Sequence, residues 1–95
     1  MLDIVKNTVR PTLHGDLDLL SLPALEAFLD SLDDEQTEVD LSGITFFDSC
    51  GLRAFLNVRR RNTSFRIVNP SASVLKVLEI TGTDDYLIHG RSVGW

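Results

Sequence analysis

The most informative stretch of the sequence spans residues 39–52 and reads Val39-Asp40-Leu41-Ser42-Gly43-Ile44-Thr45-Phe46-Phe47-Asp48-Ser49-Cys50-Gly51-Leu52. Apolar and polar residues alternate in its first half, which is the pattern of a strand with one buried face. We expect this strand to end at the turn formed by residues 48–51. Beyond the turn, the residues at helical spacing on the inner side are Leu52, Phe55, Leu56 and Arg59. A helix should therefore follow, with Arg53 and Arg60 facing water.

Two short extended segments are expected before this stretch. Residues 2–6 and 8–14 are joined near Asn7 and should pair as a hairpin. The second segment contains Pro11, which has no N–H group to donate and suits an edge or bulge position.

The first helix is expected to begin after Ser21 and to run to about Leu32. Ser21 is a plausible N-cap, and Pro23 suits the first helical turn. The inner face should carry Leu22, Leu25, Phe28, Leu29 and Leu32. The acidic residues 33–35 that follow are interpreted as a solvated turn.

The last third of the chain continues the alternation. Residues 65–68 should form a short strand, and Asn69-Pro70 has the form of an N-cap followed by proline at the first helical position. The third helix should bury Val74, Leu75 and Leu78 and should end at Gly82, which can adopt a left-handed conformation. Residues 86–88 could form one more short element.

Together these segments predict an α/β protein in which a small mixed β-sheet packs with about three to four helices. We find no repeat or linker composition, so residues 1–95 are expected to form a single domain. Function in such sheets lies at the carboxyl ends of the strands. The turn at residues 48–51 lies at such a place.

Composition excludes several classes of function. The formal charge of −5 argues against direct binding to nucleic acid. The run Arg59-Arg60-Arg61 is interpreted as a solvated helix end. No apolar run is long enough to span a membrane, and the start has no signal-peptide pattern. The single cysteine, Cys50, cannot form an internal disulfide, so a cytoplasmic location is expected.

The turn at residues 48–51 carries the candidate chemistry. A serine at the first turn of a helix lies near backbone N–H groups that lack intrahelical partners, and these groups favour a phosphate. Asp48 can cap the same turn, and Gly51 would leave the surface without a side chain where a partner or kinase approaches. A phosphorylation switch and an ordinary helix cap both agree with this pattern.

Residues 39–52 resemble the central signature of the STAS family, the domain named for sulfate transporters and anti-sigma factor antagonists. Three further segments resemble family motifs in the same order, and with the signature they extend over nearly the whole chain: residues 15–18, 68–71 and 78–82. The sequence departs from the family pattern at Cys50, where a second serine is common, and at Thr83, where an apolar residue is usual.

The resemblance implies a stand-alone anti-sigma factor antagonist that controls transcription by partner switching. Such a protein binds an anti-sigma factor with serine kinase activity, is phosphorylated on the first hydroxyl residue, here Ser49, and is restored by a serine phosphatase. The family's acidic loop corresponds to Asp16 and Asp18. The expected partner-binding residues are Asp16, Asp18, Asp48, Ser49, Cys50, Gly51 and Arg53.

Two alternatives remain open from the sequence. The domain could be a permanently docked, unphosphorylated accessory subunit of a membrane transporter or of a larger signalling assembly. It could also be an enzyme that uses Cys50 at a helix N-terminus, but a cysteine phosphatase needs an arginine where Leu56 stands, and no histidine base lies nearby in the sequence. We expect no enzyme activity, metal or cofactor, and the oligomeric state is left open.

Overall fold

The computed structural model describes residues 2–5, 10–32 and 37–90 of the chain. Four strands and four helices follow one another within these residues: β1 (Asp3–Val5), β2 (Thr12–Leu17), α1 (Leu22–Asp30), β3 (Glu38–Phe47), α2 (Ser49–Arg61), β4 (Arg66–Val68), α3 (Ala72–Thr81) and α4 (Asp84–Leu87).

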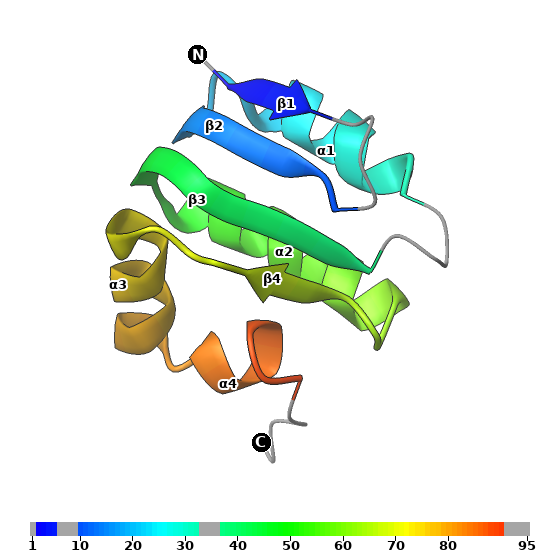
Figure 1. The fold of residues 1–95 in the computed structure, drawn as a ribbon, viewed down its shortest axis with the longest axis vertical. Coiled ribbons are helices and arrows are strands. Elements are labelled where there is room, and N and C mark those ends of the chain that lie inside the picture. Colours follow the sequence, from blue (N-terminus) through cyan, green and yellow to red (C-terminus); the bar gives the residue numbers. More distant parts are fainter. Residues whose placement is uncertain (1, 6–9, 33–36, 91–95) are drawn as a thin grey trace.

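The strands form one mixed sheet in the order β1-β2-β3-β4. β1 pairs with β2 antiparallel, whereas β2 with β3 and β3 with β4 are parallel. In Figure 1, α1 and α2 lie behind the sheet, and α3 and α4 lie alongside its β4 edge. The expected α/β class and mixed sheet with helices are thus confirmed.

β3 lies inside the sheet, between β2 and β4, and the apolar residues that alternate along its sequence are largely buried. Its side chains Val39, Leu41, Ile44 and Phe47 are buried, while Phe46 is 48% exposed. Phe55 of α2 lies between two other rings, with centroids 6.1 Å from Phe47 and 6.0 Å from Phe65. Stacked and tilted aromatic pairs of this kind add to the free energy gained by burial. The core lies between the sheet and the helices, and α1, α2, α3 and α4 all contribute buried side chains to it.

The expected hairpin is present, with different bounds. The second strand begins at Thr12 and reaches Leu17, and the link near Asn7 lies outside the described residues. Pro11 is buried just before this strand, and its carbonyl accepts a hydrogen bond from the Asp40 N–H at 2.8 Å. β2 is an inner strand, so of the edge or bulge position expected for Pro11 the edge alternative is wrong. The pairing of β2 with β3 shifts register between Thr12 and His14, next to Pro11, which agrees with the bulge alternative.

The start predicted for the first helix is confirmed, because Ser21 occupies the N-cap position of α1, although its side chain makes no cap bond. The predicted N-cap at Asn69 with Pro70 is wrong, because Ser71 caps α3 by accepting a hydrogen bond from the Val74 N–H at 3.3 Å. The expected left-handed Gly82 does end α3. The last element also lies earlier than expected, at Asp84–Leu87.

Asn69 instead connects β4 to α3 in a left-handed conformation, with a φ of 47°. Its side-chain amide donates to Asp40 Oδ2 at 2.9 Å, and this bond to β3 supports a backbone conformation that few residues other than glycine adopt. Partial burial alone would raise the pKa of Asp40. Hydrogen bonds from Asn69 and Ser42 and the positive charge of Arg10 outweigh it and hold the pKa below the ordinary value.

The basic run at the end of α2 is not uniformly solvated, contrary to the sequence interpretation. Arg59 is 5% exposed, and its Nε and Nη2 donate to the carbonyl oxygens of Tyr86 and Gly90, each at 3.2 Å. The guanidinium also lies 4.5 Å from the centre of the Tyr86 ring. Arg61 remains exposed and pairs with Asp30 at 2.9 Å. Arg59 thus fastens the segment after α3 to the rest of the fold.

Candidate functional site

The turn at Ser49 lies where β3 passes into α2. Ser49 is the first residue of α2 and is exposed. Asp48 is its N-cap, with an extended backbone and a side-chain Oδ1 that accepts from the N–H groups of Cys50 at 3.0 Å and Gly51 at 3.2 Å. The Asp48 N–H donates to the carbonyl of Leu17, which fixes the turn to the end of β2. Hydrogen bonds within α2 and to β2 therefore hold the backbone next to Ser49 in place.

This cap changes the expected electrostatics of a phosphate on Ser49. Free N–H groups were expected at this turn, and Asp48 was expected to cap it; the Asp48 carboxylate accepts from the N–H groups of both Cys50 and Gly51. A phosphate would meet the Asp48 carboxylate at close range, and like charges repel. The helix dipole still favours a negative charge at this end of α2.

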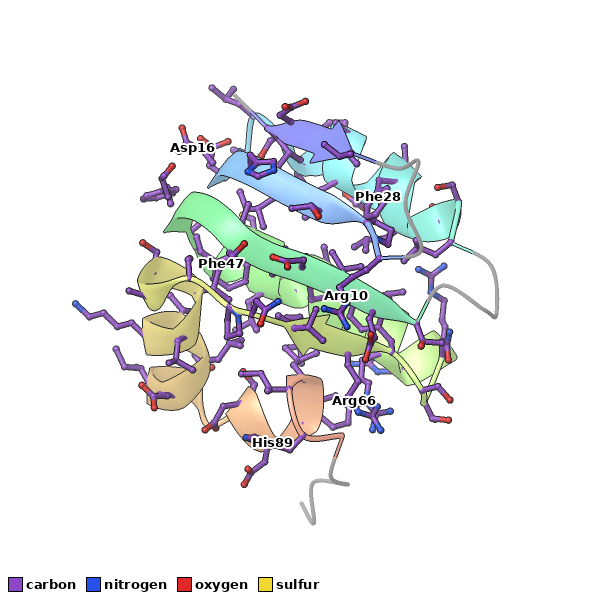
Figure 2. The ribbon with its side chains drawn as sticks, viewed as in Figure 1. Arg10, Asp16, Phe28, Phe47, Arg66 and His89 are labelled. Carbon is purple, nitrogen blue, oxygen red and sulfur yellow. The ribbon has the colours of Figure 1, made fainter. Side chains whose placement is uncertain are left out.

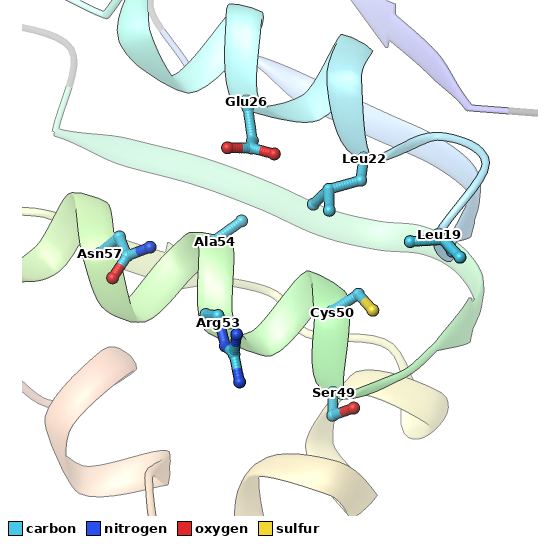
Figure 3. Close-up of a pocket in the computed structure, with 8 residues that line it drawn as sticks. All are labelled: Leu19, Leu22, Glu26, Ser49, Cys50, Arg53, Ala54 and Asn57. Carbon is cyan, nitrogen blue, oxygen red and sulfur yellow. The ribbon is translucent and has the colours of Figure 1, made fainter.

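A groove of about 310 Å³ runs beside Ser49, between α1 and α2. Figure 3 shows its lining: Leu19, Leu22, Glu26, Ser49, Cys50, Arg53, Ala54 and Asn57. Three of the predicted partner-binding residues, Ser49, Cys50 and Arg53, thus share one feature of the surface. Cys50 is half-buried, and its thiol is free.

Gly51 lies elsewhere than expected, because it is buried rather than open to a partner. A Cβ added to Gly51 would lie 3.1 Å from the Phe47 ring and 3.2 Å from the Cβ of Leu17. Such distances are shorter than ordinary packing contacts, so the missing side chain lets α2 approach the sheet closely. Glycine is therefore required at position 51 by the packing of α2 against the sheet and not by a partner.

Asp16 and Asp18 line a second hollow, of about 420 Å³, together with Leu2, Leu20, Ser21 and Ala24. Asp16 accepts a hydrogen bond from the Thr45 hydroxyl at 3.0 Å, and Figure 2 shows it at the same end of the sheet as Phe47. Asp18 accepts from the Ser21 N–H at 3.1 Å. Of the seven predicted partner-binding residues, Ser49, Cys50 and Arg53 line the groove, Asp16 and Asp18 line the second hollow, and Asp48 and Gly51 line neither. The Asp18 carboxylate also stabilises its own loop.

The loop that separates β2 from α1 carries two exposed leucines that were not predicted from the sequence. Leu19 is 67% exposed and Leu20 is 91% exposed. Leu19 lines the groove beside Ser49, and Leu20 lines the hollow beside Asp16. Their position between the end of a strand and the N-cap of a helix was the available signal, because a loop residue has no helical or sheet face to bury.

Among residues 2–5, 10–32 and 37–90, no group of three or more His, Cys, Asp or Glu side chains is placed to hold a metal ion. Within the same residues, no helix is both long and apolar enough to cross a membrane.

Comparisons with known proteins give a family-model match, a similar curated protein and a similar solved structure. Residues 1–89 match the family model described as "Mlab, STAS domain". The chain is 26% identical over 96 residues to a protein named "Anti-sigma-B factor antagonist" from Bacillus subtilis (strain 168), and the alignment covers 94% of this chain and 88% of that protein. The fold matches the crystal structure of an anti-sigma factor antagonist from Mycobacterium paratuberculosis, with a TM-score of 0.72 and 21% identity over 92% of this chain and 81% of that chain.

Proposed function

Because the chain belongs to the STAS domain family, we propose that it is an anti-sigma factor antagonist whose binding is switched off by phosphorylation of Ser49. The unmodified protein binds an anti-sigma factor and so releases a sigma factor for transcription. The similarity to the Bacillus subtilis antagonist supports this role.

The observation that carries the proposal is the exposed Ser49 hydroxyl on a capped helix start, with exposed leucines beside it. Leu19 lies on the groove that Ser49 also lines, and the neighbouring Leu20 is almost fully exposed. Apolar side chains that extend into water next to polar groups are typical of a protein-binding surface. A partner that covers these leucines would lie close to the Ser49 hydroxyl.

The negative charge of a phosphate on Ser49 would weaken the binding of the partner. A kinase partner would transfer the γ-phosphoryl group of ATP to Ser49 Oγ, with loss of the hydroxyl proton and release of ADP. The product carries about −1.5 to −2 charge near pH 7, next to the Asp48 carboxylate. A partner surface that fits a neutral hydroxyl must then desolvate this charge. A serine phosphatase would restore the hydroxyl by hydrolysis to inorganic phosphate.

The acceptor site can be tested with matched variants. The partner is captured from lysate of the source organism with the Ser49→Ala protein as bait, identified, purified, and incubated with labelled ATP and each variant. We expect label on the wild type and on Cys50→Ser, and none on Ser49→Ala. Undiminished labelling of Ser49→Ala would place the acceptor elsewhere.

A second readout separates the switch from a permanently docked accessory role. The protein is purified from its native cells, and its phosphorylation is measured by mass spectrometry in growth and under stress. The switch requires phosphate on Ser49 in at least one condition. Stable complexes with transporter components and no phosphate in any condition would favour the accessory role.

A further inference from the structure

Ser49 and Arg53 occupy positions i and i+4 of α2, and both are exposed. Residues at this spacing are neighbours on one face of a helix. Both also line the groove between α1 and α2, and Figure 3 shows Arg53 one turn along the helix from Ser49. Helical side chains lean toward the N-terminus, so the Arg53 guanidinium can reach the turn that carries Ser49.

Arg53 has no internal partner in the part of the chain that the structure describes. Two other arginines of α2 are engaged there, Arg59 with backbone carbonyls and Arg61 with Asp30. Among the described residues that line the groove, Arg53 carries the single positive charge, and Glu26 on α1 carries the single negative one. The guanidinium is thus available to a new anion at Ser49.

The Asp48 cap leaves fewer helix donors for a phosphate on Ser49, so a nearby cation would favour its dianion. The N–H groups of Cys50 and Gly51 already donate to Asp48 Oδ1. The order of the two charges along the helix is also the favourable one, because an anion one turn before a cation agrees with the helix dipole.

We propose that Arg53 pairs in cis with a phosphate on Ser49. The modification then changes the groove twice: it adds negative charge at Ser49 and withdraws from a partner the positive charge that Arg53 offers in the unmodified protein. An acidic side chain of the partner is the group that Arg53 would bind in that state. This regulation rests on the proposed function, since it supposes that Ser49 is phosphorylated.

The test uses the full chain with phosphoserine placed at position 49 by genetic encoding, so it needs neither the kinase nor the partner. The second ionisation of the phosphate is followed by ³¹P NMR between pH 4 and pH 9. Arg53 favours the dianion, so Arg53→Gln should raise the pKa of this ionisation by about 0.15 to 0.4 pH units. Arg60→Gln, which removes an exposed arginine farther along α2, should leave it unchanged.

Asp16, Asp18, Glu26 and Asp48 are kept in every variant, so the difference between variants reports Arg53 alone. Arg53→Lys should fall between the wild type and Arg53→Gln, because lysine keeps the charge but not the planar fork. Melting curves check that each variant is folded. Equal phosphate pKa values in the wild type and Arg53→Gln would overturn the inference while leaving the phosphorylation switch intact. A cell that never phosphorylates Ser49 would refute the switch and leave this titration unaffected.

Discussion

Two arginines of α2 mark two different regions of the molecule. Arg53, near the start of the helix, is exposed and lines the groove beside Ser49. Arg59, near its end, is buried, bonded to the carbonyls of Tyr86 and Gly90, and stacked on the Tyr86 ring. Arg59 therefore stabilises the fold at one end of α2, whereas Arg53 is exposed to solvent at the other.

The difference extends to the surroundings of each arginine. Around Arg59, the polar groups have partners from other elements of the fold. Around Arg53, the Leu19 side chain and Ser49 are exposed. Exposed groups of this kind add no packing to the fold, and this is why the proposed partner surface is assigned to the Ser49 end of α2.

The sharpest test of the comparison removes each guanidinium and keeps an unbranched side chain. Arg59→Met should lower the free energy of unfolding by about 2 to 4 kcal/mol, because it leaves two carbonyl oxygens without donors and deletes the contact with Tyr86. Arg53→Met should change it by less than about 0.5 kcal/mol. Urea unfolding of both variants measures the two values. Similar losses would show that Arg53 has a structural role after all.

Loss of the Asp48 cap of α2 should lower the free energy of unfolding by an amount between those expected for the two arginine variants. Asp48→Ala removes the acceptor for the N–H groups of Cys50 and Gly51 and should cost about 0.5 to 2 kcal/mol. Asp48→Asn keeps an acceptor oxygen and should cost less. Thermal and urea unfolding of the pair measure the difference, and an Asn variant as unstable as the Ala variant would argue against the cap.

A smaller effect is expected at Asn69, in the region where charges have internal partners. Asn69→Gly keeps the left-handed conformation but removes the hydrogen bond to Asp40, at a cost of about 0.5 to 1.5 kcal/mol at pH 7. The pKa of Asp40 is lowered in the folded state. Its contribution to stability is therefore complete above the unfolded value of about 3.9 and is lost as the pH falls through the folded value.

The measurement for Asn69→Gly is an NMR titration of the Asp40 carboxyl together with unfolding at pH 7 and at pH 3. The Asp40 midpoint should rise in the variant, and the difference in stability from the wild type should shrink at pH 3. An unchanged midpoint would mean that the Asn69 bond does not contribute to the low pKa.

The sequence was sufficient for features that depend on neighbours along the chain. The alternation in residues 39–47 predicted β3, the helical spacing after Asp48 predicted α2, and Gly82 predicted the end of α3. Asp48 was correctly identified as a cap. These features depend on periodicity and on side chains that bond to their own turn.

The errors concern residues whose surroundings come from distant elements. Asn69 adopts its conformation because Asp40 of β3 lies beside it, and Arg59 is buried because Tyr86 and Gly90 bring carbonyls to it. Gly51 is needed because the parallel pairing of β2 and β3 places Leu17 under α2. No local pattern reports such contacts. The partner-binding role of the Ser49 region stays a prediction.

The central claim is that a phosphate on Ser49 weakens partner binding at the interface and leaves the domain folded. Titration calorimetry of the captured anti-sigma factor with unmodified and Ser49-phosphorylated protein tests it most directly, with melting curves of both forms alongside. We predict an affinity at least about tenfold lower for the phosphorylated form, equivalent to about 1.4 kcal/mol or more, with the cooperative melting transition retained. Equal affinities, or loss of the melting transition on phosphorylation, would contradict the account.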